Sequence, residues 1–110
     1  MTNELWEILV PTTRRLSNGT VVPCSTRYHR VWDAVIRDIT GGLTILKPAK
    51  GYWVDDGEIY TDRTIPVRIA CTREQIEKII DITLSYYNQV AVMAYKISDE
   101  VIVKRFIEIL

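Results

Sequence analysis

The order in which helix-like and strand-like patterns follow one another constrains the fold of this chain more than any single motif. Ser25 or Thr26 can cap a helix whose apolar residues recur at helical spacing, and the glycine pair at 41–42 predicts its end. Thr72 precedes a second segment of this kind, and Gln75 completes a capping box with it. We therefore expect two helices that are well separated along the chain.

Segments rich in strand-forming residues surround the two helices. We predict strands over residues 5–12, 43–54, 59–71, 90–97 and 101–107. The second strand should bend near Pro48, and the sequence DDG at 55–57 predicts a tight turn into the third. The loop 13–24 contains a hairpin-type turn, SNGT, that can form a small ribbon. The order β-α-β-β-α-β, followed by a terminal strand, predicts an α+β fold, the ferredoxin-like plait: an antiparallel sheet with both helices on one face.

The length of 110 residues fits a single domain over residues 1–110. Two helices cover only one face of such a sheet, yet the predicted strand 90–97 is apolar in both of its alternating phases. An uncovered apolar sheet face predicts burial by a partner. We therefore expect a homo-oligomer, and the architecture alone is compatible with dimers and with trimers.

The overall charge and hydropathy exclude several classes of protein. The formal net charge is zero, which is not the basic excess of a general nucleic-acid binder. No run of apolar residues is long enough to cross a membrane as a helix, and the N-terminus lacks the pattern of a signal peptide. A cytoplasmic location is the expectation, and Cys24 and Cys71 should then be reduced.

Histidine and cysteine, the residues that most often carry nucleophilic or zinc chemistry, are few in the sequence. His29 is the only histidine, and the two cysteines lack metal-ligand spacing. We therefore predict no metal site within one chain and no bound cofactor. His29 itself is expected to be a partly exposed histidine on the first helix.

The segment around the predicted turn concentrates aromatic and acidic residues. Tyr52, Trp53, Tyr60 and Asp62 can form ordinary cross-strand pairs on a hairpin. They can also line a site for a cationic or planar ligand, since aromatic faces attract cations and a carboxylate adds to that attraction. Strand alternation places Asp62 and Thr64 on the face that the helices leave open.

Arg27 lies in the first turn of the first helix, where the helix dipole favours an anion. Its positive charge can therefore attract a bound carboxylate or phosphate. The alternative is a solvated arginine that pairs with Asp33 or Asp38.

Several short pieces of the sequence together resemble a known family. They are L-W-E-I-L-V near the start, T-R-Y-H-R in the first helix, K-G-Y-W, D-R-T-I-P-V-R-I-A-C-T and Y-Y-N-Q-V-A-V-M-A-Y-K. Their order and spacing over residues 5–96 resemble the phage-encoded S-adenosylmethionine lyases. This resemblance implies a PII-like trimer that binds its substrate between subunits and counteracts methylation and restriction in the host.

The reaction that this resemblance implies needs no cofactor. The carboxylate of S-adenosylmethionine attacks its own γ-carbon, so that methylthioadenosine leaves and homoserine lactone forms. The resemblance implies Asp62 and Tyr52 as catalytic residues, with Trp53 as the other candidate for the position of the tyrosine. Trp53, Tyr60, Arg27 and Thr64 would bind the substrate.

Two other functions are compatible with the same features. A PII-like oligomer can bind or sequester an adenine nucleotide at the same clefts without consuming it. A structural or adaptor oligomer needs no small ligand at all. Recovery of the ligand intact separates a binding protein from a lyase.

Overall fold

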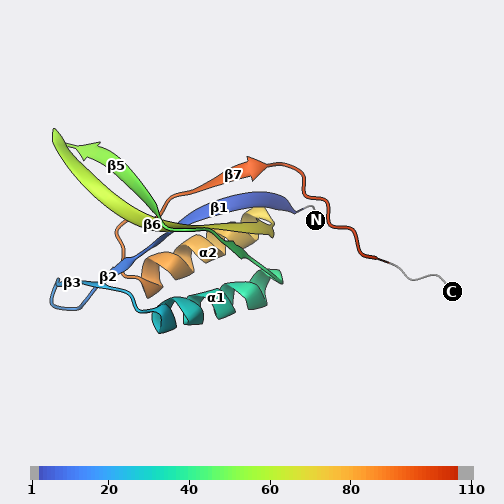
Figure 1. The fold of residues 1–110 in the computed structure, drawn as a ribbon, viewed down its shortest axis with the longest axis horizontal. Helices are drawn as coiled ribbons and strands as arrows, with labels where there is room; N and C mark the ends of the chain where they lie inside the picture. The colour runs from blue at the N-terminus through green and yellow to red at the C-terminus, as the bar shows by residue number, and fades with distance from the viewer. Residues whose placement is uncertain (1–2, 107–110) are drawn as a thin grey trace.

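In the computed structural model, which describes residues 3–106, an antiparallel sheet lies against two helices (Figure 1). The strands of this sheet are β1 (Glu4–Pro11), β4 (Thr44–Ile45), β5 (Ala49–Asp55), β6 (Glu58–Cys71) and β7 (Ala94–Ser98). The helices are α1 (Thr26–Thr40) and α2 (Arg73–Tyr86). A separate two-stranded ribbon, β2 (Thr13–Arg15) with β3 (Val21–Pro23), confirms the ribbon predicted in the loop before α1.

The strand order β4–β6–β1–β7, with β5 also paired to β6, is that of the predicted ferredoxin-like plait. The second predicted strand is divided into β4 and β5, and the expected bend at Pro48 lies between them. Pro66 lies opposite this break, in the central strand β6 rather than on an edge. The Pro66 carbonyl accepts from the Leu46 N–H at 2.9 Å. Since the carbonyl and the nitrogen of one strand residue face the same side, the proline nitrogen faces the break between β4 and β5, where the sheet needs no N–H donor.

Both helices begin as their caps predict, and α1 also ends at the predicted glycine pair. The Ser25 hydroxyl accepts from the Tyr28 N–H, and α1 ends where Gly41 adopts a φ of 89°. Thr72 and Gln75 form the predicted reciprocal capping box of α2. These local signals fix where each helix starts against the sheet.

The core lies between the helices and one face of the sheet. Its buried apolar residues are Trp6, Ile8 and Val10 of β1, Val67, Ile69 and Cys71 of β6, Trp32 and Ile36 of α1, Ile76 and Ile79 of α2, and Tyr87. Burial raises the pKa of the Cys71 thiol to about 11, which suits a packing role. A polar pair crosses the helix interface inside this core: the Trp32 indole donates to the Thr83 hydroxyl at 3.0 Å.

The C-terminal region differs from the prediction. Residues 101–106 form neither helix nor strand, so the extra strand predicted over 101–107 is wrong for these six residues, and Ile107 lies outside the described residues. A strand needs a hydrogen-bonded neighbour, and this segment runs beyond the end of the sheet (Figure 1). The strand predicted over 90–97 begins only at Ala94. Among residues 3–106, neither helix has the length and hydrophobicity to span a bilayer.

Candidate functional site

The hairpin of β5 and β6 projects beyond the rest of the sheet (Figure 1). The last pair between β1 and β6 joins Pro11 to Thr64, and β5 begins opposite the same Thr64. From that point to the turn the hairpin is only two strands wide. Asp56 and Gly57 both have positive φ, 50° and 78°, as a two-residue hairpin turn of the primed type requires.

The pairing register decides which hairpin side chains share a face. Trp53 lies opposite Tyr60, and their rings stack with centroids 4.5 Å apart and planes inclined by 19°. Asp62 lies opposite Gly51, and Thr64 follows in the same phase. Because alternate residues share a face of a strand, Trp53, Tyr60, Asp62 and Thr64 lie together. Their face continues into the side of the sheet that the helices leave open.

Tyr52 lies on the opposite face of the hairpin. It pairs with Thr61, and the Lys50 ammonium lies 5.3 Å from the centre of its ring. The two residues to which the resemblance gives catalytic roles, Tyr52 and Asp62, are therefore not brought together within one chain. The ring beside the carboxylate is Trp53, which was the alternative for the tyrosine position.

Asp62 and Arg27 lie in different layers of the protein. The Asp62 side chain is exposed, and its Oδ1 accepts from the Arg63 backbone N–H at 2.9 Å. Arg27 is also exposed, in the first turn of α1, on the helix side of the sheet. One chain does not unite these two predicted ligand-binding residues.

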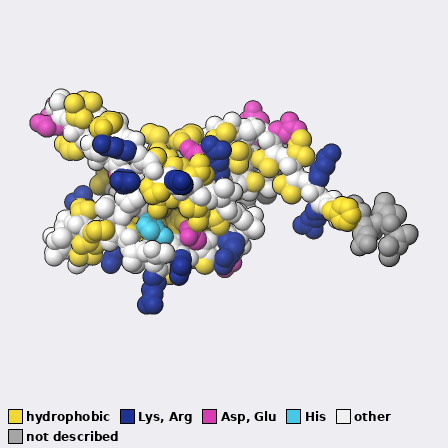
Figure 2. Space-filling view, viewed as in Figure 1, with side chains coloured by type: hydrophobic (Ala, Val, Ile, Leu, Met, Phe, Trp, Pro, Cys, Tyr) yellow, Lys and Arg dark blue, Asp and Glu magenta, His cyan; other side chains and the backbone are white. Residues whose placement is uncertain are grey.

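Several large apolar side chains of the hairpin are exposed. Exposed fractions are 66% for Tyr52, 50% for Trp53, 67% for Val54, 72% for Ile59 and 43% for Tyr60. Figure 2 shows this hydrophobic surface next to acidic side chains at the tip. Within residues 3–106, none of the four hairpin carboxylates, Asp55, Asp56, Glu58 and Asp62, forms an ion pair. The hairpin therefore combines aromatic faces with carboxylates that form no ion pair among the described residues.

A buried polar cluster on the open sheet face was missed in the sequence. Glu7 is only 7% exposed; its Oε1 accepts from Arg68 Nε at 3.0 Å, and its Oε2 accepts from the Tyr95 hydroxyl. The three residues come from the neighbouring strands β1, β6 and β7. An acidic residue between Trp6 and Ile8 in an apolar strand was the signal that could have revealed this cluster.

The pKa of the Glu7 carboxyl lies below its ordinary value. The hydrogen bond from Tyr95 has the largest effect, burial opposes it, and the hydrogen bond and charge of Arg68 add to the lowering. Glu7 is thus held as a carboxylate in the middle of the open face.

The only histidine has a structural environment. His29 Nδ1 lies 2.7 Å from the hydroxyl of Tyr87, which is fully buried, and burial lowers the pKa of the imidazole although Asp33 opposes this. Within residues 3–106, no three His, Cys, Asp or Glu side chains cluster as a metal site would require.

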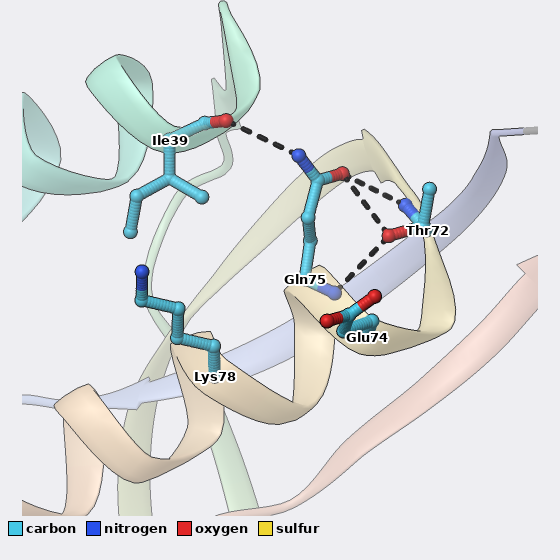
Figure 3. Close-up of a pocket in the computed structure, with 5 residues that line it drawn as sticks. All are labelled: Ile39, Thr72, Glu74, Gln75 and Lys78. Carbon is cyan, nitrogen blue, oxygen red and sulfur yellow. Dashed lines mark hydrogen bonds between the residues drawn. The ribbon is translucent and has the colours of Figure 1, made fainter. Parts of the chain in front are cut away.

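A shallow hollow of about 400 Å³ lies between the end of α1 and the start of α2 (Figure 3). Two of its polar residues serve the scaffold: the Gln75 amide donates to the Ile39 carbonyl at 3.2 Å and accepts from the Thr72 N–H at 3.0 Å. These bonds cap α2 and join it to α1. The hollow is therefore part of the scaffold, and the projecting hairpin remains the candidate site.

Comparisons with known proteins give neighbours by fold but not by sequence. No family model matches the chain, and no curated protein matches its sequence. Similar solved structures include the periplasmic divalent cation tolerance protein CutA of Archaeoglobus fulgidus, with 14% identity, a TM-score of 0.64, and 94% of this chain and 89% of that chain covered. CutA1 of Oryza sativa gives 8% identity and a TM-score of 0.65, covering 91% of this chain and 82% of its own. The divalent cation tolerance protein of Thermus thermophilus gives 14% identity and a TM-score of 0.60, covering 88% of this chain and 85% of its own.

These neighbours correct the family suggested by the short sequence pieces. The fold resembles proteins described as divalent cation tolerance proteins of the CutA type, and the identification with the S-adenosylmethionine lyases was wrong. The pieces lie in strands, helix starts and caps, and a shared fold does not imply a shared chemistry. At these identities the similarity establishes the fold alone.

Proposed function

We propose that this chain is a homo-oligomeric, PII-like binding protein that holds an adenine-containing small molecule between its copies and releases it unchanged. The observation that carries this proposal is the half-exposed Trp53–Tyr60 stack with Asp62 beside it. The stack lies on a ribbon that no third strand among residues 3–106 supports. A site of this kind is completed by a second copy.

The exposed apolar residues of the open sheet face support an assembly that would bury them. That face carries Met93, Tyr95 and Ile97 at exposed fractions of 63%, 40% and 41%. Exposed apolar groups gathered on one face mark an interaction surface. An assembly through this face, with trimers favoured, would also enclose the Glu7 carboxylate and its partners.

The side chains of the hairpin suit a planar ligand that carries an amine or another cationic group. The outer faces of Trp53 and Tyr60 are free to stack on a purine ring, and such stacking contributes about 1–3 kcal/mol for each base. Asp62 can accept a hydrogen bond from an amine and attract its charge. The three fold neighbours named above are described as CutA-type proteins, two of them as divalent cation tolerance proteins, and none of the three as a lyase, which supports binding rather than turnover.

Binding should be measured by titration calorimetry with S-adenosylmethionine, adenosine and ATP as probes. We expect Trp53→Ala to weaken the best of them at least about tenfold, in line with the loss of one stacking face. Tyr52→Ala is the matched control because it removes a similarly exposed ring from the opposite face of the hairpin. Asp62→Asn should weaken the binding of S-adenosylmethionine, the one probe with cationic groups, more than that of adenosine or ATP. Equal losses for Trp53→Ala and Tyr52→Ala would contradict the assignment of the face.

Turnover is tested on the same complexes. After a long incubation, the protein is denatured and the released ligand is analysed by chromatography. We expect the ligand to be recovered intact, whereas accumulation of methylthioadenosine that depends on Asp62 would show that the protein is an enzyme. No heat of binding and no thermal shift with any of the three probes would reject the ligand class.

A further inference from the structure

The outer edge of β5 is open. Within residues 3–106, β5 pairs only with β6, and all seven of its residues are exposed. Such an edge presents a row of unused backbone N–H and C=O groups, which proteins normally cover or interrupt. β5 contains no proline, and its exposed side chains include Tyr52, Trp53 and Val54. This edge is a ready template for an additional strand.

The segment 101–106 has the composition of a strand, but among the described residues it pairs with no other strand. Its sequence, VIVKRF, is rich in β-branched and aromatic residues. The exposed fractions of Ile102, Val103 and Phe106 are 71%, 80% and 92%. It leaves the body of the protein after a turn in which the Glu100 N–H donates to the Ser98 hydroxyl.

The segment cannot lie along β5 of its own chain. Ser98 pairs with Leu5 at one end of β1, whereas β5 begins beyond Pro11 at the other end, six residues or about 20 Å away. A fully extended chain from Ser98 to Phe106 spans about 27 Å and would also have to cross β1 and β6. Figure 1 shows the hairpin and this segment at opposite ends of the molecule.

The charges of the two elements are complementary. Lys104 and Arg105 form no ion pair among the described residues, and the same holds for Asp55, Asp56 and Glu58 at the hairpin tip. Opposite charges on adjacent strands favour pairing, and like charges oppose it. β5 itself carries Lys50 near its start and Asp55 at the tip, so the basic residues of the segment suit the tip end of this edge, where a parallel strand would place them.

We propose that residues 101–106 of one copy add as a strand to the β5 edge of a second copy. This inference rests on the proposed homo-oligomer and identifies one of its contacts. Each copy gives one segment and accepts one, which is a head-to-tail contact that a closed ring satisfies completely. The added strand makes the hairpin three strands wide beside Trp53.

Cysteine crosslinking between different copies tests the pairing directly. Val103 and Tyr52 lie at the middle of the two segments, so the pair is close whether the strands run parallel or antiparallel. Chains with Val103→Cys are refolded together with chains carrying Tyr52→Cys and then oxidised. We expect a disulfide-linked dimer in the mixture and not in either variant alone, because a disulfide needs Cα atoms within about 7 Å.

Two controls accompany the crosslinking. The unsubstituted chain, with its own Cys24 and Cys71, is oxidised in parallel. Glu77→Cys takes the place of Tyr52→Cys, since Glu77 is exposed on α2 and away from the edge.

Charge reversal gives a second readout that does not depend on disulfide geometry. Lys104→Glu with Arg105→Glu should raise the concentration at which the assembly half-dissociates by about tenfold. Asp55→Lys with Glu58→Lys should do the same, and combining the two sets should restore the assembly. Light scattering over a dilution series measures the assembly of the unsubstituted chain and of the three variants.

The outcomes separate this inference from the function on which it rests. A stable assembly without the mixed disulfide, and without an effect of charge reversal, overturns the strand addition and leaves the proposed oligomer standing. A chain that is monomeric at every concentration overturns both.

Discussion

Replacing Glu7 by glutamine should destabilise the fold far more than a typical change of a glutamate. The side chain is 10% exposed and accepts from Arg68 Nε at 3.0 Å and from the Tyr95 hydroxyl. Glutamine keeps the shape but removes the negative charge, so Arg68 loses its ion pair, and Tyr95 must either accept from the new NH2 group or lose its bond. Hydrogen bonds to charged groups contribute about 1.5–3 kcal/mol each, and the bond to the half-exposed Arg68 counts for less because water can replace it. The expected loss of unfolding free energy is about 2–3 kcal/mol.

The same cluster should make the stability depend on pH. Tyr95 and Arg68 hold the pKa of folded Glu7 below its ordinary value of 4.5, so the unfolded chain binds the proton more readily. The contribution of Glu7 is complete above about pH 4.5 and is lost as the pH falls through the folded pKa. Glu7→Gln has no such proton to bind, so this part of the slope should be missing from the variant.

Urea denaturation, followed by circular dichroism between about pH 3 and about pH 7, measures both effects. Glu77→Gln is the matched control: it breaks the exposed pair with Arg73 on α2, which should change stability by less than about 0.5 kcal/mol. If Glu7→Gln matches this control at neutral pH, or keeps the full acid slope of the wild type, the structural reasoning about the cluster is refuted.

Three further predictions concern the scaffold. Thr83→Val should lower the unfolding free energy by about 1–3 kcal/mol in urea, because the buried Trp32 indole loses its acceptor, while Thr83→Ser keeps it. Burial lowers the pKa of folded His29, so stability should fall as the pH drops below the ordinary value of 6.5, and His29→Asn should lack this part of the decline in a pH series. Gly41→Ala should cost about 1 kcal/mol through its φ of 89° alone, with Gly42→Ala as the neutral control in thermal melts.

The fold could be predicted because its signals are local. The helix ends followed from a serine cap, a capping box and a glycine in the left-handed region, each decided by residues within one turn. The division of the second strand followed from Pro48. The strand predicted over 101–106 was wrong for the opposite reason. Its composition favours a strand, but strand formation also depends on a pairing neighbour that the local sequence does not specify.

The candidate site was only partly predictable, since its geometry depends on register. The composition of the hairpin made it the candidate segment, yet a shift of one residue in pairing decides whether Tyr52 or Trp53 lies beside Asp62. Glu7 in an apolar strand indicates a buried carboxylate, but Arg68 lies 61 positions away, so the local sequence does not identify this partner. Short sequence pieces shared with a family reported the fold and carried no information on chemistry.

The two-stranded width of the hairpin has a consequence for measurements in solution. An isolated pair of strands is marginally stable in water, whereas the part of β6 that lies between β1 and β4 is held from both sides. Amide hydrogens near the tip should therefore exchange much faster than those near Val67 in any copy that stands alone. The ratio of amide exchange rates at the two ends of β6 would then measure, at each protein concentration, how far neighbouring molecules protect the hairpin.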